Sequence, residues 1–260
     1  MYEKITSKSN PYIKNLKKLY TSSKTRWNEG KYVIEGRKLC MDALLSGAKI
    51  SCILFSDQVL RKEKKFLKDL FVCKCRKICI SDEIATFLSD TKTSQGIFCV
   101  VDMQDKVVSC QDIKKEILLE CIQDPANLGA VLRSAEAFGF ERIYLTCDCV
   151  DVYNPKVLRA SMGAVFRVKF VMVDDIGDFI RAMHREGLKV YASVPDEKAK
   201  NIQALDMSAS MCVMVGNEGN GLSQVALDMC DEKVTIPMRG RAESLNASVA
   251  ASIIMWKLMN

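Results

Sequence analysis

The chain has 260 residues, of which 48% are hydrophobic and 27% charged, with 13 glycines and 5 prolines. This length suits one large domain or two modest ones, and the composition excludes collagen-like, coiled-coil and wholly disordered proteins. No apolar run reaches the roughly 18 uncharged residues of a membrane span, and residues 1–10 lack an apolar signal core. We therefore expect a cytoplasmic protein without a membrane partner.

Twelve cysteines and a single histidine restrict the possible chemistry. Many cysteines, such as Cys212, lie inside apolar runs, where a free thiol behaves as a small hydrophobic group, so a reducing compartment fits better than a disulfide framework. The cluster Cys73, Cys75 and Cys79 has neither a CxxC pair nor a neighbouring histidine, and we expect no metal site. His184, at the polar end of a helix-like segment, is interpreted as a surface residue, which leaves no histidine for a nucleophile triad.

The charge is divided unevenly along the chain. Residues 1–100 carry 20 Lys and Arg against 10 Asp and Glu, a balance of +10, whereas residues 101–260 carry 18 against 22, a balance of −4. Basic and aromatic residues alternate at the front, a mixture suited to phosphate contacts and base stacking, although a solvated helix face would carry the same charges. We expect this part to bind nucleic acid. The basic residues are Lys4, Lys8, Lys14, Lys17, Lys18, Lys24, Arg26, Lys31, Arg37 and Lys38, and the aromatic ones are Tyr12, Tyr20, Trp27 and Tyr32.

The first hundred residues predict a small α/β unit. Helices are expected over 11–20, 37–47, 61–70 and 81–90, and strands over 32–36, 50–56, 72–80 and 96–101. The polar run 102–112 is the best linker candidate. We therefore predict a first domain over 1–101, a linker over 102–115 and a second domain over 116–260.

The second domain alternates strands and helices, which predicts a parallel sheet covered by helices on both faces. Strands are expected over 117–122, 142–146, 188–193, 211–216 and 233–237, and helices over 128–139, 155–163, 176–187, 223–230 and 244–259. In such sheets a ligand usually lies beyond the carboxyl ends of the strands, so the loops that follow them are the expected site.

The first of these loops runs from Asp124 to Gly129 and leads into a helix that carries Arg133. Asn127 is the expected N-cap of that helix, and we expect Arg133 to reach forward to the strand ends. A guanidinium there suits a phosphate or a developing oxyanion, because it is a planar fork of permanent positive charge. An exposed helix arginine behind an ordinary cap is the alternative interpretation.

The second loop, Gly216 to Ser223, has three glycines within six residues, directly after an apolar strand and before a helix. Glycine permits positive φ and a close approach of the backbone to a ligand. The loop matches neither a phosphate loop ending in Gly-Lys-Ser/Thr nor the GxGxxG dinucleotide fingerprint. Glu218 among these glycines is unusual for structure alone, which favours a polar ligand.

The third loop begins at Ile236 and leads into the last helix. Ser244 could cap that helix, but Ser244, Asn246 and Ser248 together offer more hydrogen-bonding groups than one cap requires. The spare polar groups indicate recognition of a ligand.

Together, residues 127–139, 215–223 and 236–251 resemble, in order and separation, the three motifs of the SpoU/TrmH family of RNA ribose 2′-O-methyltransferases. The front part resembles the substrate-binding module of this family through residues 34–44 and 94–101. The resemblance implies an L30e-like RNA-binding domain ahead of a parallel-sheet α/β catalytic domain (SPOUT) with a trefoil knot. It also implies S-adenosylmethionine as methyl donor, without a metal, and a homodimer that packs through the catalytic domain.

The resemblance further implies roles for individual residues. The catalytic neighbourhood would contain Asn127, Arg133, Glu218, Ser244 and Asn246. The methyl donor would lie against Gly216, Asn217, Gly221, Ile236, Met238 and Leu245. Arg133 would help to remove the hydroxyl proton, or would bind the adjacent phosphate and stabilise the alkoxide.

The implied function is methylation of a ribose 2′-hydroxyl in structured RNA, with ribosomal RNA favoured and transfer RNA as the alternative substrate. A non-catalytic RNA-binding protein would explain the basic front but not three intact loops. A nucleotide-binding α/β enzyme would explain the glycine loop, but the sequence lacks the lysine and metal-binding pattern expected there.

Overall fold

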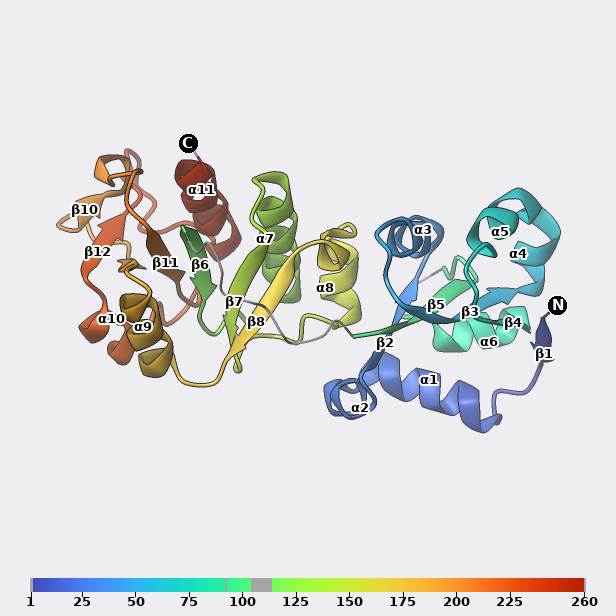
Figure 1. Cartoon of the computed structure of the whole chain (residues 1–260). Helices are drawn as coiled ribbons and strands as arrows, with labels where there is room; N and C mark the ends of the chain where they lie inside the picture. The colour runs from blue at the N-terminus through green and yellow to red at the C-terminus, as the bar shows by residue number, and fades with distance from the viewer. Residues whose placement is uncertain (1, 92, 104–113, 260) are drawn as a thin grey trace. The chain divides into compact units, whose positions relative to one another are not determined.

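A computed structural model describes residues 2–91, 93–103 and 114–259. The chain forms two compact units (Figure 1). The first comprises Met1–Asp105 and Asp151–Phe166, and the second comprises Lys106–Val150 and Arg167–Asn260. The segment 151–166 thus belongs to the front unit, although the sequence placed it in the second domain. Most of the predicted linker, residues 104–113, lies outside the described residues.

The first unit is built on a five-stranded mixed sheet. Its strands are β1 (Glu3–Ile5), β2 (Lys31–Glu35), β3 (Ile50–Ser56), β4 (Arg76–Ile80) and β5 (Ile97–Asp102), in the spatial order β1-β4-β3-β5-β2. Strands β1 and β3 run parallel to β4, whereas β5 runs antiparallel to β3 and β2. The helices are α1 (Pro11–Thr21), α2 (Ser23–Glu29), α3 (Arg37–Leu45), α4 (Asp57–Lys62), α5 (Lys64–Leu70), α6 (Asp82–Leu88), α8 (Pro155–Ala160) and the 3₁₀ turn η1 (Ala164–Phe166).

Helix α1 shows how the front sequence specifies its elements. Asn10 caps the helix by accepting the backbone N–H of Tyr12, and Pro11 occupies the first turn, where its missing N–H costs nothing. The apolar residues of the helix face the core on one side at helical spacing. Helix α2 was not predicted, because its one buried side chain is Arg26 and no apolar periodicity marks it.

Two of the four front aromatic residues, Tyr20 and Tyr32, face the core and are not available to stack on RNA bases. These two side chains are 5% and 1% exposed, and Tyr32 stacks on Tyr153 with ring centroids 4.3 Å apart. Arg26 is also unavailable to phosphate, since it is buried and its Nη2 lies 2.6 Å from Asp151 Oδ2. The mixture in the sequence does not show this, because an aromatic residue beside lysines in sequence can point inward from a helix or strand.

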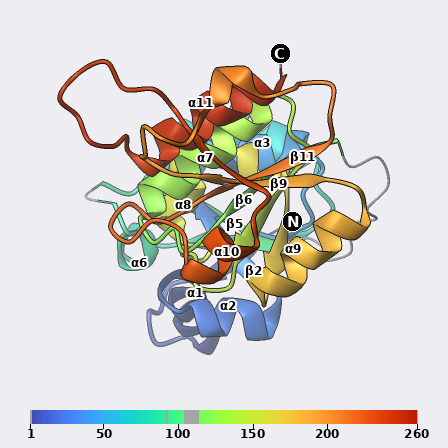
Figure 2. The same cartoon turned by 90° about the vertical axis from the view of Figure 1, so that its left-hand side faces the viewer.

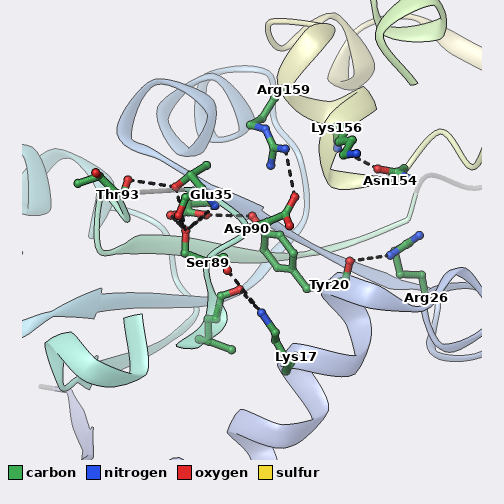
Figure 3. A network of polar contacts seen from close by, with 12 residues as sticks. Lys17, Tyr20, Arg26, Glu35, Ser89, Asp90, Thr93, Asn154, Lys156 and Arg159 are labelled. Carbon is green, nitrogen blue, oxygen red and sulfur yellow. Dashed lines mark hydrogen bonds and ion pairs between the residues drawn. The ribbon is translucent and has the colours of Figure 1, made fainter. Parts of the chain in front are cut away.

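A polar network fixes the end of β2 (Figure 3). The buried carboxylate of Glu35 accepts hydrogen bonds from Tyr20 (3.1 Å), Ser89 (2.8 Å) and Ser94 (2.9 Å). These donors offset the cost of removing the charge from water. Arg159 of α8 forms an ion pair of 3.2 Å with Asp90, so the segment 151–166 is joined to the same network.

The second unit is built on a seven-stranded sheet whose described pairings are all parallel. Its strands are β6 (Lys115–Leu119), β7 (Arg142–Thr146), β8 (Lys169–Val173), β9 (Lys189–Ser193), β10 (Lys200–Asn201), β11 (Met211–Val215) and β12 (Glu232–Thr235), in the order β10-β12-β9-β11-β6-β7-β8. The helices are α7 (Pro125–Ala137), α9 (Ile176–Arg185), α10 (Gln224–Met229) and α11 (Ala247–Met259), with the 3₁₀ turn η2 (Ile202–Ala204).

The helices of the second unit cover both faces of this sheet, as predicted. Helices α7 and α11 lie side by side on one face, and α9 and α10 lie on the other (Figures 1 and 2). The edge strands β8 and β10 were not predicted from the sequence. Among the described residues, no helix is long and apolar enough to span a bilayer.

Candidate active site

The three loops singled out in the sequence follow β6, β11 and β12 at the carboxyl edge of the parallel sheet. Because β6 and β11 are neighbouring strands, the loop before α7 and the glycine loop begin side by side. The third loop leads from β12 to α11, which packs against α7. This topology brings the three loops together.

A cavity of about 420 Å³ lies between the glycine loop, the third loop and the start of α11. Its walls are largely apolar, with Leu222, Leu227, Ile236 and Leu245 among the lining residues. All six residues predicted to hold the methyl donor line this cavity: Gly216, Asn217, Gly221, Ile236, Met238 and Leu245. Glu218 and Ser244 line it as well.

Asn217 organises the glycine loop. Its backbone exchanges two hydrogen bonds with Gly221, of 3.1 and 2.9 Å, and its Oδ1 accepts the N–H groups of Gly219 (2.8 Å) and Asn220 (3.2 Å). A Cβ at Gly216 would overlap the backbone of Gly221. Gly216 is therefore required by the closure of the loop itself, and the backbone of the loop forms the cavity wall.

One side chain from each loop forms a continuous hydrogen-bonded chain. Asn246 Nδ2 donates to Asn127 Oδ1 over 3.1 Å, and Asn127 Nδ2 donates to Glu218 Oε1. The direction is fixed at one end, because Asn246 Oδ1 accepts the backbone N–H of Ser248 at 3.0 Å and its amide nitrogen must then face Asn127. The chain ends on a carboxylate at the cavity.

Two predicted helix caps are wrong. Asp124, not Asn127, caps α7, because the helix begins at Pro125, whose fixed φ suits the first helical position. Asp124 Oδ1 accepts the backbone N–H of Ala126 at 2.6 Å, which leaves the Asn127 side chain available to Glu218. At α11 the capping side chain is Asn246, and Ser244 remains exposed ahead of the helix.

Arg133 is not brought to the cavity by this single chain. It is exposed on α7, and within the described part of the chain it makes no hydrogen bond or ion pair. It follows Asn127 by six residues, so the two side chains leave the helix roughly 120° apart. Four of the five residues assigned to catalysis therefore lie at or beside the cavity, and Arg133 lies on a different face of α7.

The structure adds two residues that sequence reasoning missed, Glu120 and Cys121 at the end of β6. The Glu120 carboxylate is 6% exposed and accepts the backbone N–H of Ser223 at 2.8 Å. Cys121 has a φ of 56°, in the left-handed region that non-glycine residues rarely adopt, and such conformations often mark functional sites. Burial and the neighbouring Asp148 raise the pKa of the Cys121 thiol, so it stays protonated near neutral pH.

The remaining chemically distinctive residues lie outside this site. His184, on α9, is partly exposed and its Nε2 lies 2.9 Å from Asp231 Oδ2. Across residues 2–91, 93–103 and 114–259, no group of three or more His, Cys, Asp or Glu side chains is arranged to hold a metal. The cysteines in these ranges are all free thiols.

Comparison with known proteins decides the family. Residues 114–256 match the SpoU rRNA Methylase family, and residues 10–99 match an MRM3-like substrate binding domain. The chain belongs to the SpoU rRNA methylase family. The family membership and the α/β fold predicted from the sequence are thereby confirmed.

Relatives of this SpoU protein match along almost its whole length. It is 32% identical to the 23S rRNA (guanosine(2553)-2′-O)-methyltransferase RlmP of Bacillus subtilis, over 98% of this chain and 99% of that one. An uncharacterized tRNA/rRNA methyltransferase of Synechocystis is 30% identical over 97% and 92% of the two chains. The SpoU methyltransferase AviRb from Streptomyces viridochromogenes, solved in complex with AdoMet, gives a TM-score of 0.86 at 25% identity, covering 96% of this chain and 97% of that one.

Proposed function

We propose that this chain transfers a methyl group from S-adenosylmethionine to a ribose 2′-hydroxyl of structured RNA in the cytoplasm, with ribosomal RNA as the substrate. The observation that carries this proposal is the chain of hydrogen bonds from Asn246 through Asn127 to Glu218, which joins all three motif loops and ends in the wall of one cavity. The Bacillus subtilis relative, which acts on 23S rRNA by its name, supports ribosomal over transfer RNA.

The cavity fits the methyl donor by its chemistry. Apolar side chains such as Leu222 and Leu245 suit a flat adenine ring, and the glycine-rich backbone supplies N–H and C=O groups without side chains in the way. The AdoMet-bound AviRb structure supports this assignment. When bound, S-adenosylmethionine presents an electrophilic methyl group on a sulfonium. The chain contributes orientation. Asn127 holds Glu218, and Glu218 and Ser244 hold the ribose in line with the methyl group.

No histidine lines this cavity, and Cys121 is protonated, so neither supplies a general base. Arg133 lies away from the cavity of its own chain, and its proposed role is to bind the phosphate beside the target ribose, where its permanent charge would stabilise the developing alkoxide. Its guanidinium makes no ion pair within the described residues that would have to break first.

The second unit also pairs with a copy of itself. Helix α11 exposes apolar side chains at spacings of seven and three residues, which place them along one stripe: Val249 is 46%, Trp256 55% and Met259 50% exposed. A stripe of this kind on a helix supports an interface. Analytical ultracentrifugation tests this homodimer: the parent should sediment as a dimer and Trp256→Glu as a monomer, and a monomeric parent would rule it out.

The division of labour follows the two units. Residues 1–101, together with residues 151–166 that belong to the same unit, bind RNA, and the remainder of residues 116–260 carries out the transfer. Residues 102–115 connect the two parts. Within the front unit, Lys14, Lys18 and Lys24 are exposed and form no ion pair among the described residues, which supports phosphate binding by this surface.

Two measurements test the proposed function. Calorimetry with the purified protein should show S-adenosylmethionine binding, and ribosomal RNA from cells without the gene should lack 2′-O-methylation at one nucleotide. Transfer RNA mapped in parallel distinguishes the alternative substrate. A folded protein with no detectable binding at millimolar S-adenosylmethionine would defeat the enzyme assignment and leave an RNA-binding role.

A further inference from the structure

The end of β6 holds both ends of the glycine loop. Glu120 accepts the backbone N–H of Ser223, which follows the loop, at 2.8 Å. The Cys121 carbonyl accepts Asn217 Nδ2, near the start of the loop, also at 2.8 Å. Residues 218–222 lie between these two attachments, and all of them line the cavity, as do Gly216 and Asn217. Two adjacent residues that directly follow β6 therefore hold a whole wall of the cavity.

Glu120 is an unusual residue for this attachment, because a buried carboxylate normally has a cationic partner. It is 94% buried by residue surface, yet the described part of the chain gives it no cationic partner. Glu116, four residues earlier and within β6, is buried to a similar degree but pairs with Arg142 at 2.7 Å. Removing a carboxylate from water without a cation is costly, so its presence indicates that the hydrogen bond to Ser223 matters at this position.

The other attachment depends on a strained backbone. The left-handed φ of Cys121 is maintained by the Thr146 hydroxyl, which accepts the Cys121 N–H at 3.0 Å, and by Cys149 Sγ, which accepts the Ile122 N–H at 3.3 Å. A conformation of this kind persists only where its surroundings determine it. These contacts come from the end of β7 and the loop after it. The β7 end therefore supports the Cys121 backbone, and the Cys121 carbonyl in turn supports the glycine loop.

We infer that Glu120 is a positioning residue for the methyl donor: by holding Ser223 it fixes the glycine-loop wall and so sets the affinity for S-adenosylmethionine. This inference rests on the proposed function, which places S-adenosylmethionine in this cavity. Glu120 does not line the cavity, so it acts through the loop and not by touching the ligand.

The experiment compares Glu120→Ala and Glu120→Gln with a matched control, Glu116→Gln, which changes an equally buried glutamate four residues earlier. S-adenosylmethionine affinity is measured by calorimetry well below the midpoint of thermal unfolding of each variant. Losing a hydrogen bond to a charged group should weaken binding about tenfold or more in Glu120→Ala. Glu120→Gln, which keeps a carbonyl oxygen, should lose less. Single-turnover rates at saturating cofactor and RNA should fall by a smaller factor than the affinity does, since Glu120 acts through the loop and touches neither substrate.

The control separates positioning from stability. Glu116→Gln should lower the unfolding temperature while leaving S-adenosylmethionine affinity within about twofold of the parent. Parent-like binding by Glu120→Ala, or equal loss of affinity in Glu120→Gln and Glu116→Gln, would overturn the inference. A parent that does not bind S-adenosylmethionine would instead defeat the proposed function, which is a separate result read on the unmodified protein.

Discussion

Gly216 is required for the closure of the glycine loop itself, and not only for the approach of a ligand to its backbone. The sequence suggested that these glycines let the backbone approach a bound molecule. In the structure, the approach at Gly216 is to the backbone of Gly221 and Leu222, and a Cβ there would overlap both residues. The closed loop that forms this cavity wall therefore depends on glycine at position 216.

Gly216→Ala should weaken S-adenosylmethionine binding by about 10–100-fold, because overpacking costs about 1–3 kcal/mol and the loop must open to admit the methyl group. Gly240→Ala is the control, since a Cβ at Gly240 meets no atom within 4 Å. Calorimetric titration of both variants checks this expectation. Equal affinities for the parent and Gly216→Ala would show that the loop adapts without cost.

Asn246 performs two tasks that substitution can separate. Its oxygen caps α11 and its nitrogen donates to Asn127. Asn246→Asp keeps a good N-cap but replaces the donor with an acceptor, so the Asn127 amide must turn and present its oxygen to Glu218. We expect an unfolding temperature close to the parent's and a methyl-transfer rate at least about tenfold lower. Asn246→Ala should lose about 1 kcal/mol of stability in addition. Thermal melts and single-turnover assays distinguish these effects. Unchanged turnover in Asn246→Asp would exclude a catalytic role for the hydrogen-bonded chain from Asn246 to Glu218.

At the scale of elements, the long apolar elements were predictable and the others were not. Strands β3 and β7 were predicted with their bounds, because apolar side chains mark them. Helix α2 buries only Arg26 and carries no hydrophobic pattern. Edge strand β8 has an apolar run, KFVMV, but it is short and only partly covered, and it was not assigned. The candidate cavity residues were identified through the family resemblance. The Glu120 and Cys121 attachments were not, because strand-end contacts depend on which strands become neighbours.

Helix α7 carries Asn127 beside the cavity and Arg133 on a different face, so the role of Arg133 needs a test of its own. Arg133→Ala should leave S-adenosylmethionine affinity unchanged and lower the single-turnover rate about 10²-fold or more, if its charge stabilises the reacting oxygen. Arg185→Ala is the matched control, since Arg185 is also exposed and without an ion pair among the described residues. Turnover of Arg133→Ala within about threefold of the parent would leave this residue as an ordinary surface arginine.

The segment 151–166 contributes a buried anchor to the front unit. Asp151 pairs with Arg26 at 2.6 Å, and the side chains are 9% and 3% exposed. Asp151→Ala leaves a buried guanidinium without its partner, which should lower the free energy of unfolding by about 3–5 kcal/mol. The exposed pair of Lys200 and Glu232 provides a contrast, and Glu232→Ala should cost under about 1 kcal/mol. Urea denaturation measures both, and equal losses would show that the buried pair adds nothing beyond a surface contact.

At the scale of the whole molecule, the two units are interleaved in sequence. A boundary near residue 101 was a reasonable prediction from the polar run that follows, but residues 151–166 pack with the front unit, where Tyr153 stacks on Tyr32. Removing residues 1–100 would therefore expose Tyr153 and Asp151 as well as remove the lysines. Point substitutions at the surface test RNA binding more cleanly than truncation. The trefoil knot implied by the resemblance stays a prediction, because hydrophobic patterns carry no information on how a chain threads.

The basic front unit should contribute RNA affinity through exposed lysines that have no competing carboxylate. In a triple variant, Lys14, Lys18 and Lys24 are each replaced by glutamine, which removes three such charges from α1 and α2 and leaves the core and the Arg26 pair intact. Each phosphate contact that is lost should reduce the slope of log affinity against log salt by roughly 0.7–0.9, so the slope should fall by about two. S-adenosylmethionine affinity should not change.

A control variant carries glutamine at Lys169, Lys198 and Lys233, three exposed lysines of the second unit, and tests for a general effect of net charge. Filter binding to a ribosomal RNA fragment at four salt concentrations gives both slopes. Identical slopes for the two variants would mean that the front unit attracts RNA through overall charge and not through this surface.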